Sequence, residues 1–531
     1  MDVVGSVVTI LTLAQTVISI CIKVRATCKS NSGFDTVFDS AILGAEVQVQ
    51  RLVSWSSSFR AESCSDPLRD LLGRVLQTVE VEIKTIHGYI EKYMPGSDNP
   101  LSSLSIEERL DVSSLPTQKQ TQFDDLGNTS IKKKGPSIIN RFHYVISDKD
   151  RLLSHSAALE KAVDQLHALL PANRQLTLEL KFLASLLKTD DIDELSAIAS
   201  STGSHSYQNI QSSASIKAAR IRGEILPRST NRMSKLLDCN RQGFSLERRW
   251  EGKDIGTYEG RKVLVEWKTC TDELSVEEST HRIADVARLL HQTGVTRPKD
   301  LIALDCLGYM KKPPSIGLVY ALPLTYSERL PKSLFKLLLD KESDPSTWPS
   351  WEQRQKLAWV LARAVFQLHV VGWLHKGIRP QNIMFIGDGK SLKSPYLIGF
   401  DYARRGEYGE KTESTDPAFD LYRHPFAQGE ARSKFQASFD LFALGLILLE
   451  IGIWGSLQDQ RQPLENEFKG SSQDAQTKFH WLLMEGKGPL KHLPFYMGNK
   501  YYDAVKTCLS IDPADLTEDV YITDIIANLE S

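Results

Sequence analysis

The side chains best suited to chemistry lie in the second half of the 531-residue chain. Lys268 stands in a β-rich run, Asn382 ends a loop sequence, and Asp401 follows a short apolar segment. A lysine that holds phosphates, and an amide and a carboxylate that bind metal ions, are parts of a phosphoryl-transfer site. Such a site also needs a carboxylate that accepts the proton of the attacking hydroxyl. None of residues 374–385, around Asn382, is acidic.

Residues 374–385, LHKGIRPQNIMF, resemble the catalytic loop of protein kinases. His375 and Asn382 match the loop motif, and the resemblance gives Asn382 the role of a metal ligand. Gly377 stands at the position of the catalytic aspartate, and loss of a general base costs about 10²–10⁴ in rate. We therefore expect no catalytic residue here, with His375 and Asn382 as remnants of the motif.

The segment YLIGFDYAR (396–404) resembles the part of a kinase that carries the metal-binding Asp-Phe-Gly motif. Gly399 aligns with the aspartate of that motif, so the metal ligand is absent, and Asp401 follows two positions later. A shift in loop register would let Asp401 reach a cation. The sequence thus predicts no ordinary metal site and leaves Asp401 as an alternative ligand.

The segment VEWK resembles the kinase strand whose lysine holds the phosphates, which gives that role to Lys268. Strand alternation places Glu266 on the same face as Lys268. In active kinases that position is small and lies under the adenine, so Glu266 would crowd a purine and could capture Lys268. The helix residue that positions Lys268 is either Asp285 or Glu278. Residues 246–261 contain no GxGxxG, which predicts a weak phosphate cradle.

Later segments keep the frame of the kinase-like domain. In SFDLFALG, Asp440 and Gly445 match the motif of a buried kinase helix. Phe426 and Leu516 stand where kinases carry a buried glutamate–arginine ion pair, and paired apolar replacement of such ions can be neutral for stability. The resemblance covers about residues 240–525 and implies a small β-rich lobe followed by a larger helical lobe.

Composition and charge exclude some function classes. The net charge of −2 provides no field that would attract nucleic acid, so no nucleic-acid partner is expected. The seven cysteines are scattered and form no CxxC pair, which argues against a disulfide framework or a zinc site. A reducing, cytoplasmic location fits this cysteine usage.

The N-terminal residues 3–22, VVGSVVTILTLAQTVISICI, carry no charge and are nearly long enough to span a bilayer. They lack a basic region before the apolar stretch and a small-residue cleavage site after it, so a secretory signal is not expected. Hydroxyl residues recur at helical spacing and form a mildly polar stripe. We expect a helix that can pack inside a helical bundle and can also enter a membrane.

The first 200 residues have the pattern of several helices. Residues 147–171 place a series of apolar residues on one helix face, namely Leu152, Leu159, Val163, Leu166 and Leu170. The N-terminal segment, RLVSWSSSF (51–59) and the segment 142–171 together resemble the HeLo domain, a helical cell-death module of filamentous fungi. The resemblance implies a membrane-targeting bundle whose N-terminal helix is released on activation.

The predicted fold is multidomain, with an N-terminal all-α helical bundle followed by an α+β two-lobed protein-kinase-like fold. We predict a HeLo-like bundle over 1–200, a linker over 201–239 that begins with a hydroxyl-rich stretch, a small lobe over 240–345 and a helical large lobe over 346–531.

Three functions compete on these residues. The first is a pseudokinase-regulated HeLo effector of cell-death or incompatibility signalling, without enzymatic activity. Its expected partners are membrane lipid, through residues 1–24, and a second copy or an upstream signalling protein; activation would move it from the cytoplasm to the plasma membrane. The second is an atypical Ser/Thr kinase that binds ATP and Mg²⁺ through Lys268, Asn382 and Asp401. The third is a non-catalytic protein-binding scaffold.

Overall fold

The computed structural model describes residues 44–45, 47–49, 51–52, 55, 66–93, 149–200, 208–225, 238–269, 273–291, 297–326, 329–340, 348–387, 392–400, 403–405, 420–428, 434–459 and 472–530. The apolar segment 3–22 and Asp401 lie outside these residues. The chain divides into two compact units, residues 1–182 with 196–207 and residues 183–195 with 208–531. We refer to them as the N-terminal and C-terminal units.

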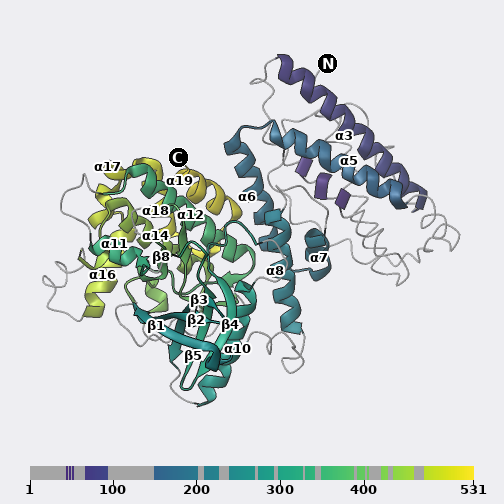
Figure 1. The fold of residues 1–531 in the computed structure, drawn as a ribbon. Helices are drawn as coiled ribbons and strands as arrows, with labels where there is room; N and C mark the ends of the chain where they lie inside the picture. The colour runs from purple at the N-terminus through teal and green to yellow at the C-terminus, as the bar shows by residue number, and fades with distance from the viewer. Residues whose placement is uncertain are drawn as a thin grey trace, which may run out of the picture. The chain divides into compact units, whose positions relative to one another are not determined.

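The N-terminal unit is built on two helices that pack side by side, α3 (Asp66–Tyr93) and α5 (Lys149–Ala168) (Figure 1). The apolar series predicted for one face of the second helix is buried at each position: Leu152, Leu159, Val163, Leu166 and Leu170 are at most 5% exposed. The prediction of a core-facing helix in this segment is therefore confirmed.

Polar contacts tie the earlier part of this unit to α5. Arg51 is buried and forms an ion pair with Asp164, with 2.8 Å between Nη2 and Oδ1. The indole N–H of Trp55 donates to the carbonyl oxygen of Leu166 over 2.9 Å. Because Trp55 is 1% exposed, this bond satisfies a polar group that burial would otherwise leave unpaired.

Three further helices follow in the chain: α6 (Ala172–Lys188), α7 (Ile192–Ser200) and α8 (Gln208–Ile225). Both α6 and α7 contribute residues to both units, whereas α8 belongs to the C-terminal unit. The stretch predicted as a linker therefore contains a helix. Ser212, Ser213 and Ala214 of that helix are buried, although their sequence is rich in small and hydroxyl residues.

A five-stranded antiparallel sheet opens the remainder of the C-terminal unit, in the order β1-β2-β3-β5-β4. Helix α10 (Glu273–Leu290) connects β3 to β4 and packs against β4 and β5. Odd-numbered residues Val263, Val265 and Trp267 of β3 pack in one apolar cluster, which leaves the even-numbered ones for the other face. The strands are β1 (Phe244–Trp250), β2 (Lys253–Tyr258), β3 (Arg261–Thr269), β4 (Asp305–Lys312) and β5 (Ser315–Ala321).

The rest of this unit is mainly helical, with short strand pairs (Figure 1). Helix α14 is apolar on all sides and accordingly buried, and it packs against α12 and α18. The helices are α11 (Leu334–Leu339), α12 (Trp351–Val370), α14 (Ala437–Ile453), α16 (Ser472–Met484), α17 (Leu493–Met497), α18 (Asn499–Ser510) and α19 (Ala527–Leu529), with a π-helix, η14, over Val520–Ile526. The short strands are β6 (Lys332–Ser333), β7 (Trp373–Leu374), β8 (Ile383–Phe385), β9 (Pro395–Leu397) and β10 (Arg404–Arg405).

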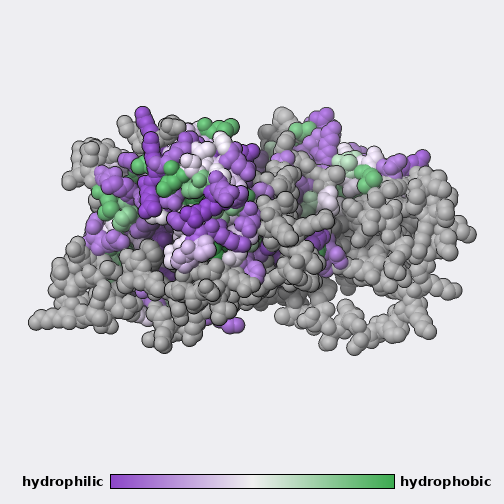
Figure 2. All heavy atoms as spheres, turned by 60° about the horizontal axis from the view of Figure 1, so that its bottom comes forward, coloured by the Kyte–Doolittle hydropathy of each residue, from purple (hydrophilic) through white to green (hydrophobic). Residues whose placement is uncertain are grey.

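These elements confirm a helix-rich N-terminal part and an α+β C-terminal part. Among the described residues, no helix has the length and apolarity that a membrane span requires. On the face drawn in Figure 2, hydrophilic residues predominate among the coloured atoms, and hydrophobic ones form small separate spots.

Candidate functional site

The loop that begins at His375 is held by a buried aspartate from α14. Asp440 is 1% exposed and lies in the first turn of that helix. Its carboxylate accepts the backbone N–H of His375 over 2.7 Å and that of Lys376 over 2.9 Å. Lys376 has a φ of 60°, a conformation that costs energy for a side-chain-bearing residue. Asp440 thus fixes the backbone of the loop at its strained point.

His375 is a buried part of this frame. Its Nδ1 accepts the N–H of Gly377 over 3.2 Å, and its ring lies 4.5 Å from the ring of Phe400. Burial lowers the pKa of His375 to about 4, so the ring is neutral at physiological pH. The matched histidine therefore connects two loops by packing, which is a structural role.

Asn382 and the two glycines meet at one point. The side-chain amide of Asn382 donates to the carbonyl oxygen of Gly377 over 2.7 Å. Gly399 has a φ of 82°, and a Cβ at that position would collide with the Asn382 side chain. A Cβ at Gly377 would lie 3.1 Å from the carbonyl oxygen of Gly399, a tight but smaller conflict. The structure thus brings Gly377, Asn382 and Gly399 together at one point, with His375 beside Gly377.

Glu266 reaches this point from the sheet. It is 5% exposed, and both carboxylate oxygens lie 3.0 Å from the backbone nitrogen of Gly399, which donates to them. The ammonium of Lys253 lies 3.9 Å from Oε1 of the same carboxylate. The structure thus gives Glu266 the Gly399 amide and the Lys253 ammonium as partners. The Gly399 amide therefore faces the Glu266 carboxylate.

Lys268 lies two residues beyond Glu266 on the same face of β3 and is partly buried. Asp285, one of its two candidate helix partners, forms an ion pair with Arg288 of the same helix. The side chain of Glu278, the other candidate, lies outside the described residues.

A tight hairpin forms within residues 246–261, the segment in which the resemblance would place a glycine-rich loop. Strands β1 and β2 are joined by Glu251 and Gly252, which have φ values of 45° and 79°. This pair of positive φ angles is typical of a two-residue hairpin turn. The hydroxyl of Ser333 donates to Glu251 Oε1 over 2.9 Å. The turn is short and tethered, so it lacks the backbone freedom that phosphate cradling requires.

A further polar site, missed by the sequence analysis, lies inside α14. Glu450 is fully buried, and its Oε1 accepts the hydroxyl of Tyr422 over 2.7 Å and the N–H of Leu457 over 2.8 Å. Burial raises the pKa of Glu450 to about 8, above its ordinary value of 4.5. The available sequence signal was a glutamate within an otherwise apolar run, LILLEIGI.

The expected replacement of a buried ion pair by packed apolar residues is wrong at Phe426. This side chain is 48% exposed, and its ring lies 5.3 Å from that of His424. It belongs to a short turn, Pro425–Ala427, in which Ala427 is the buried residue. Leu516 is partly exposed as well. The two residues therefore do not form a buried substitute for the ion pair.

The described residues do not fit an ordinary magnesium–nucleotide site. Mg²⁺ prefers carboxylate, phosphate and water oxygens. Gly399 offers no side chain, and Glu266 is engaged with the Gly399 amide. The buried Oδ1 of Asn382 has no hydrogen-bond partner and is the single oxygen that the predicted ligand positions present among the described residues.

Comparison with known proteins identifies two family matches. Residues 5–198 match the HeLo family, described as prion-inhibition and propagation. Residues 321–518 match a domain of unknown function, DUF7580. The first match supports the predicted HeLo resemblance of the N-terminal part, while the second assigns no activity.

One curated protein is similar over a short stretch. The eukaryotic translation initiation factor 2-alpha kinase 1 of Mus musculus is 29% identical over 99 residues. The alignment covers 17% of this chain and 16% of the mouse protein.

Proposed function

We propose that the chain is a signalling effector in which a HeLo-type bundle acts and a catalytically inert, kinase-like C-terminal unit controls it. The HeLo match over residues 5–198 supports the first half of this proposal. The expected setting is cell-death or incompatibility signalling of the fungal type, which is the process associated with HeLo domains.

The kinase-like assignment of the C-terminal unit is supported by the order and placement of its elements. A five-stranded antiparallel sheet has its helix α10 between β3 and β4, and a helical part follows. Within that part, Asp440 holds the backbone of the loop that resembles a catalytic loop. The short similarity to a mouse kinase points in the same direction.

The main support for the proposed lack of catalysis is the contact between Glu266 and Gly399. A buried carboxylate from β3 bonds the backbone amide of the residue where a metal-binding side chain belongs. A nucleotide phosphate brought to this point would meet that carboxylate, and like charges repel strongly at low dielectric. We therefore propose that the unit works as a two-state regulator without phosphoryl transfer.

The decisive test measures phosphate transfer and nucleotide binding by the full chain. We expect no transfer from ATP to a peptide and no thermal stabilisation by Mg²⁺–ATP, in the wild type and in Gly377→Asp alike. The aspartate restores one carboxylate but leaves Gly399 and Glu266 unchanged. Transfer at the rate of an ordinary kinase, abolished by Lys268→Ala, would establish the atypical-kinase alternative with Lys268, Asn382 and Asp401.

A second experiment tests the membrane half of the proposal. We expect residues 1–24 to insert into lipid after activation, so the full chain is compared with a chain that lacks them. Both are added to anionic liposomes loaded with a fluorescent dye, and leakage is recorded. Leakage that depends on residues 1–24 supports the effector. No leakage under any condition, together with a stable protein partner, would favour the scaffold alternative.

A further inference from the structure

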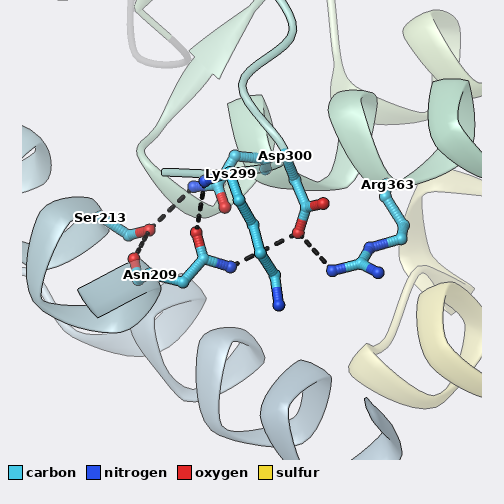
Figure 3. A network of polar contacts seen from close by, with 6 residues as sticks. Asn209, Ser213, Lys299, Asp300 and Arg363 are labelled. Atoms are coloured by element: carbon cyan, nitrogen blue, oxygen red, sulfur yellow. Dashed lines mark hydrogen bonds and ion pairs between the residues drawn. The ribbon is translucent and has the colours of Figure 1, made fainter. Parts of the chain in front are cut away.

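Helix α8 connects three separate segments of the C-terminal unit through polar contacts. Its N-terminal end meets the segment 297–300, which follows α10 and precedes β4 (Figure 3). The side chain of Asn209 accepts the backbone N–H of Lys299 over 3.1 Å and donates to Asp300 Oδ2 over 3.4 Å. The same Asp300 oxygen accepts Arg363 of α12 over 2.6 Å. Asp300 therefore joins α8 to α12 through the segment that precedes β4.

The middle of α8 lies against α12 and the turn after it. The side chain of Gln367 donates to the hydroxyl of Ser213 over 2.9 Å, and both residues are at most 1% exposed. Further along, the guanidinium of Arg220 lies against Gly372, where a Cβ would come within 2.8 Å of it. These contacts follow one side of the helix from its first turn to Arg220.

Between Ser213 and Arg220, α8 also contacts the C-terminal end of α6. Lys217 is 3% exposed, and its ammonium donates to the carbonyl oxygen of Leu186 over 2.5 Å. The last carbonyls of a helix have no partner within it and carry partial negative charge. The ammonium also lies 3.0 Å from Asp190, which is 66% exposed. Lys217 therefore caps α6 from another helix.

The polar composition of this contact surface favours reversible release of α8 from its neighbours. The buried apolar residues of α8 are Ile210, Ala214 and Ala218, and Ile216 and Ile221 are partly buried. The contacts that fix the helix are hydrogen bonds and ion pairs from Asn209, Ser213, Lys217 and Arg220. Water can replace polar contacts when the helix leaves, whereas a large apolar face would resist exposure.

We propose that α8 is a polar clamp that couples the segment 297–300 of the sheet region to the C-terminal end of α6. Loss of the contacts that Asn209 makes loosens α8 and thereby removes the Lys217 cap from α6. Because α6 also contributes residues to the N-terminal unit, the clamp supplies a release step for the proposed effector. It rests on the proposed function for its biological meaning, although its test needs neither a membrane nor a nucleotide.

The test is hydrogen exchange of the full chain, read by mass spectrometry in separate peptides. The variant Asp300→Asn removes the charge that Arg363 and Asn209 contact. We expect exchange at residues 186–194 to accelerate by about tenfold, together with exchange in α8, because a buried pair that loses one partner is strongly weakened. The control is Asp238→Asn, which breaks an exposed ion pair with Lys311 and is expected to leave 186–194 unchanged.

Reciprocity supplies the second arm of the test, since coupling between two sites acts in both directions. Lys217→Met keeps the length of the side chain and removes the cap. It should accelerate exchange at 186–190 and also at 299–304, whereas Lys181→Met, an exposed position on α6, should do neither. The milder Asn209→Ala replaces Asp300→Asn if that variant does not fold.

The inference is overturned if each variant changes exchange only next to its own site. Faster exchange at 297–304 and 208–213 with wild-type rates at 186–194 would show that α8 transmits nothing. Because this readout is independent of lipid, the clamp and the membrane activity fail or succeed separately.

Discussion

Replacement of Glu450 by glutamine should make the C-terminal unit more stable at high pH and have little effect at low pH. Glu450 is fully buried in α14, and its Oε1 accepts bonds from Tyr422 and Leu457. Glutamine keeps an acceptor oxygen in the same place. It removes the negative charge that the carboxylate carries when ionised. No cation is among the contacts described for the Glu450 side chain, so that charge is unpaired in the wild type.

The magnitude follows from proton linkage. The pKa of Glu450 is about 8 in the folded protein against 4.5 ordinarily, so between these pH values the folded state keeps a proton that the unfolded state releases. The stabilisation linked to that proton is fully present below about pH 4.5 and is lost as the pH rises through 8. With about 1.4 kcal/mol for each pH unit, the wild type loses at most ~4 kcal/mol between pH 5 and pH 8.

The assay is urea unfolding of the wild type and Glu450→Gln at pH 5, 6.5 and 8, with exchange of the α14 amides as a local readout. His375 and His424, whose pKa values burial lowers to about 4, contribute equally to both proteins and cancel in the difference. We expect the advantage of the variant to grow steadily with pH. A constant difference across this range would refute the assignment of a buried, protonated glutamate.

Two further substitutions test the loop frame. Asp440→Asn should destabilise the C-terminal unit by about 3 kcal/mol in urea unfolding, because an amide N–H₂ would face one of the two backbone N–H groups that donate to the carboxylate. The control is Asp503→Asn, at an exposed position of α18. Equal effects of the two substitutions would contradict the role of Asp440. Gly399→Ala should lower the free energy of unfolding by about 2–4 kcal/mol in thermal or urea unfolding, because it adds a collision with Asn382 to an unfavourable φ. The control is Gly252→Ala, which has a similar φ but open space around it and should lower that free energy by about 1 kcal/mol. Equal losses of stability at the two glycines would show that the Asn382 side chain moves aside at little cost and would contradict the predicted collision.

The sequence predicted those parts of the fold whose pattern reflects apolar packing. The spacing of Leu152, Leu159 and Val163 identified the buried face of α5, since helical periodicity records which side meets the core. The positions of His375, Asn382 and the two glycines were recognisable because their order along the chain is distinctive. Their meeting at one point is a finding of the structure, because the order of motifs does not give the contacts between them.

The features that the sequence did not predict depend on polar contacts between distant segments. Helix α8 gave no amphipathic signal, because the side of it that is buried is largely polar. Ser212 and Ser213 bond the carbonyl oxygens of Gln208 and Asn209 within the helix, which makes a hydroxyl-rich stretch compatible with burial. The choice of Gly399 as the partner of Glu266 likewise depends on how the sheet meets a loop more than a hundred residues away.

The meeting of Asn382 with Gly399 also limits how this chain could change. An aspartate at Gly399 would need a left-handed backbone and would collide with Asn382, so the acid cannot be inserted alone without damage to the fold. Glu266 would still occupy the Gly399 amide after that change. A single substitution that introduces this acid therefore carries a steric cost, which only a second change at Asn382 would relieve.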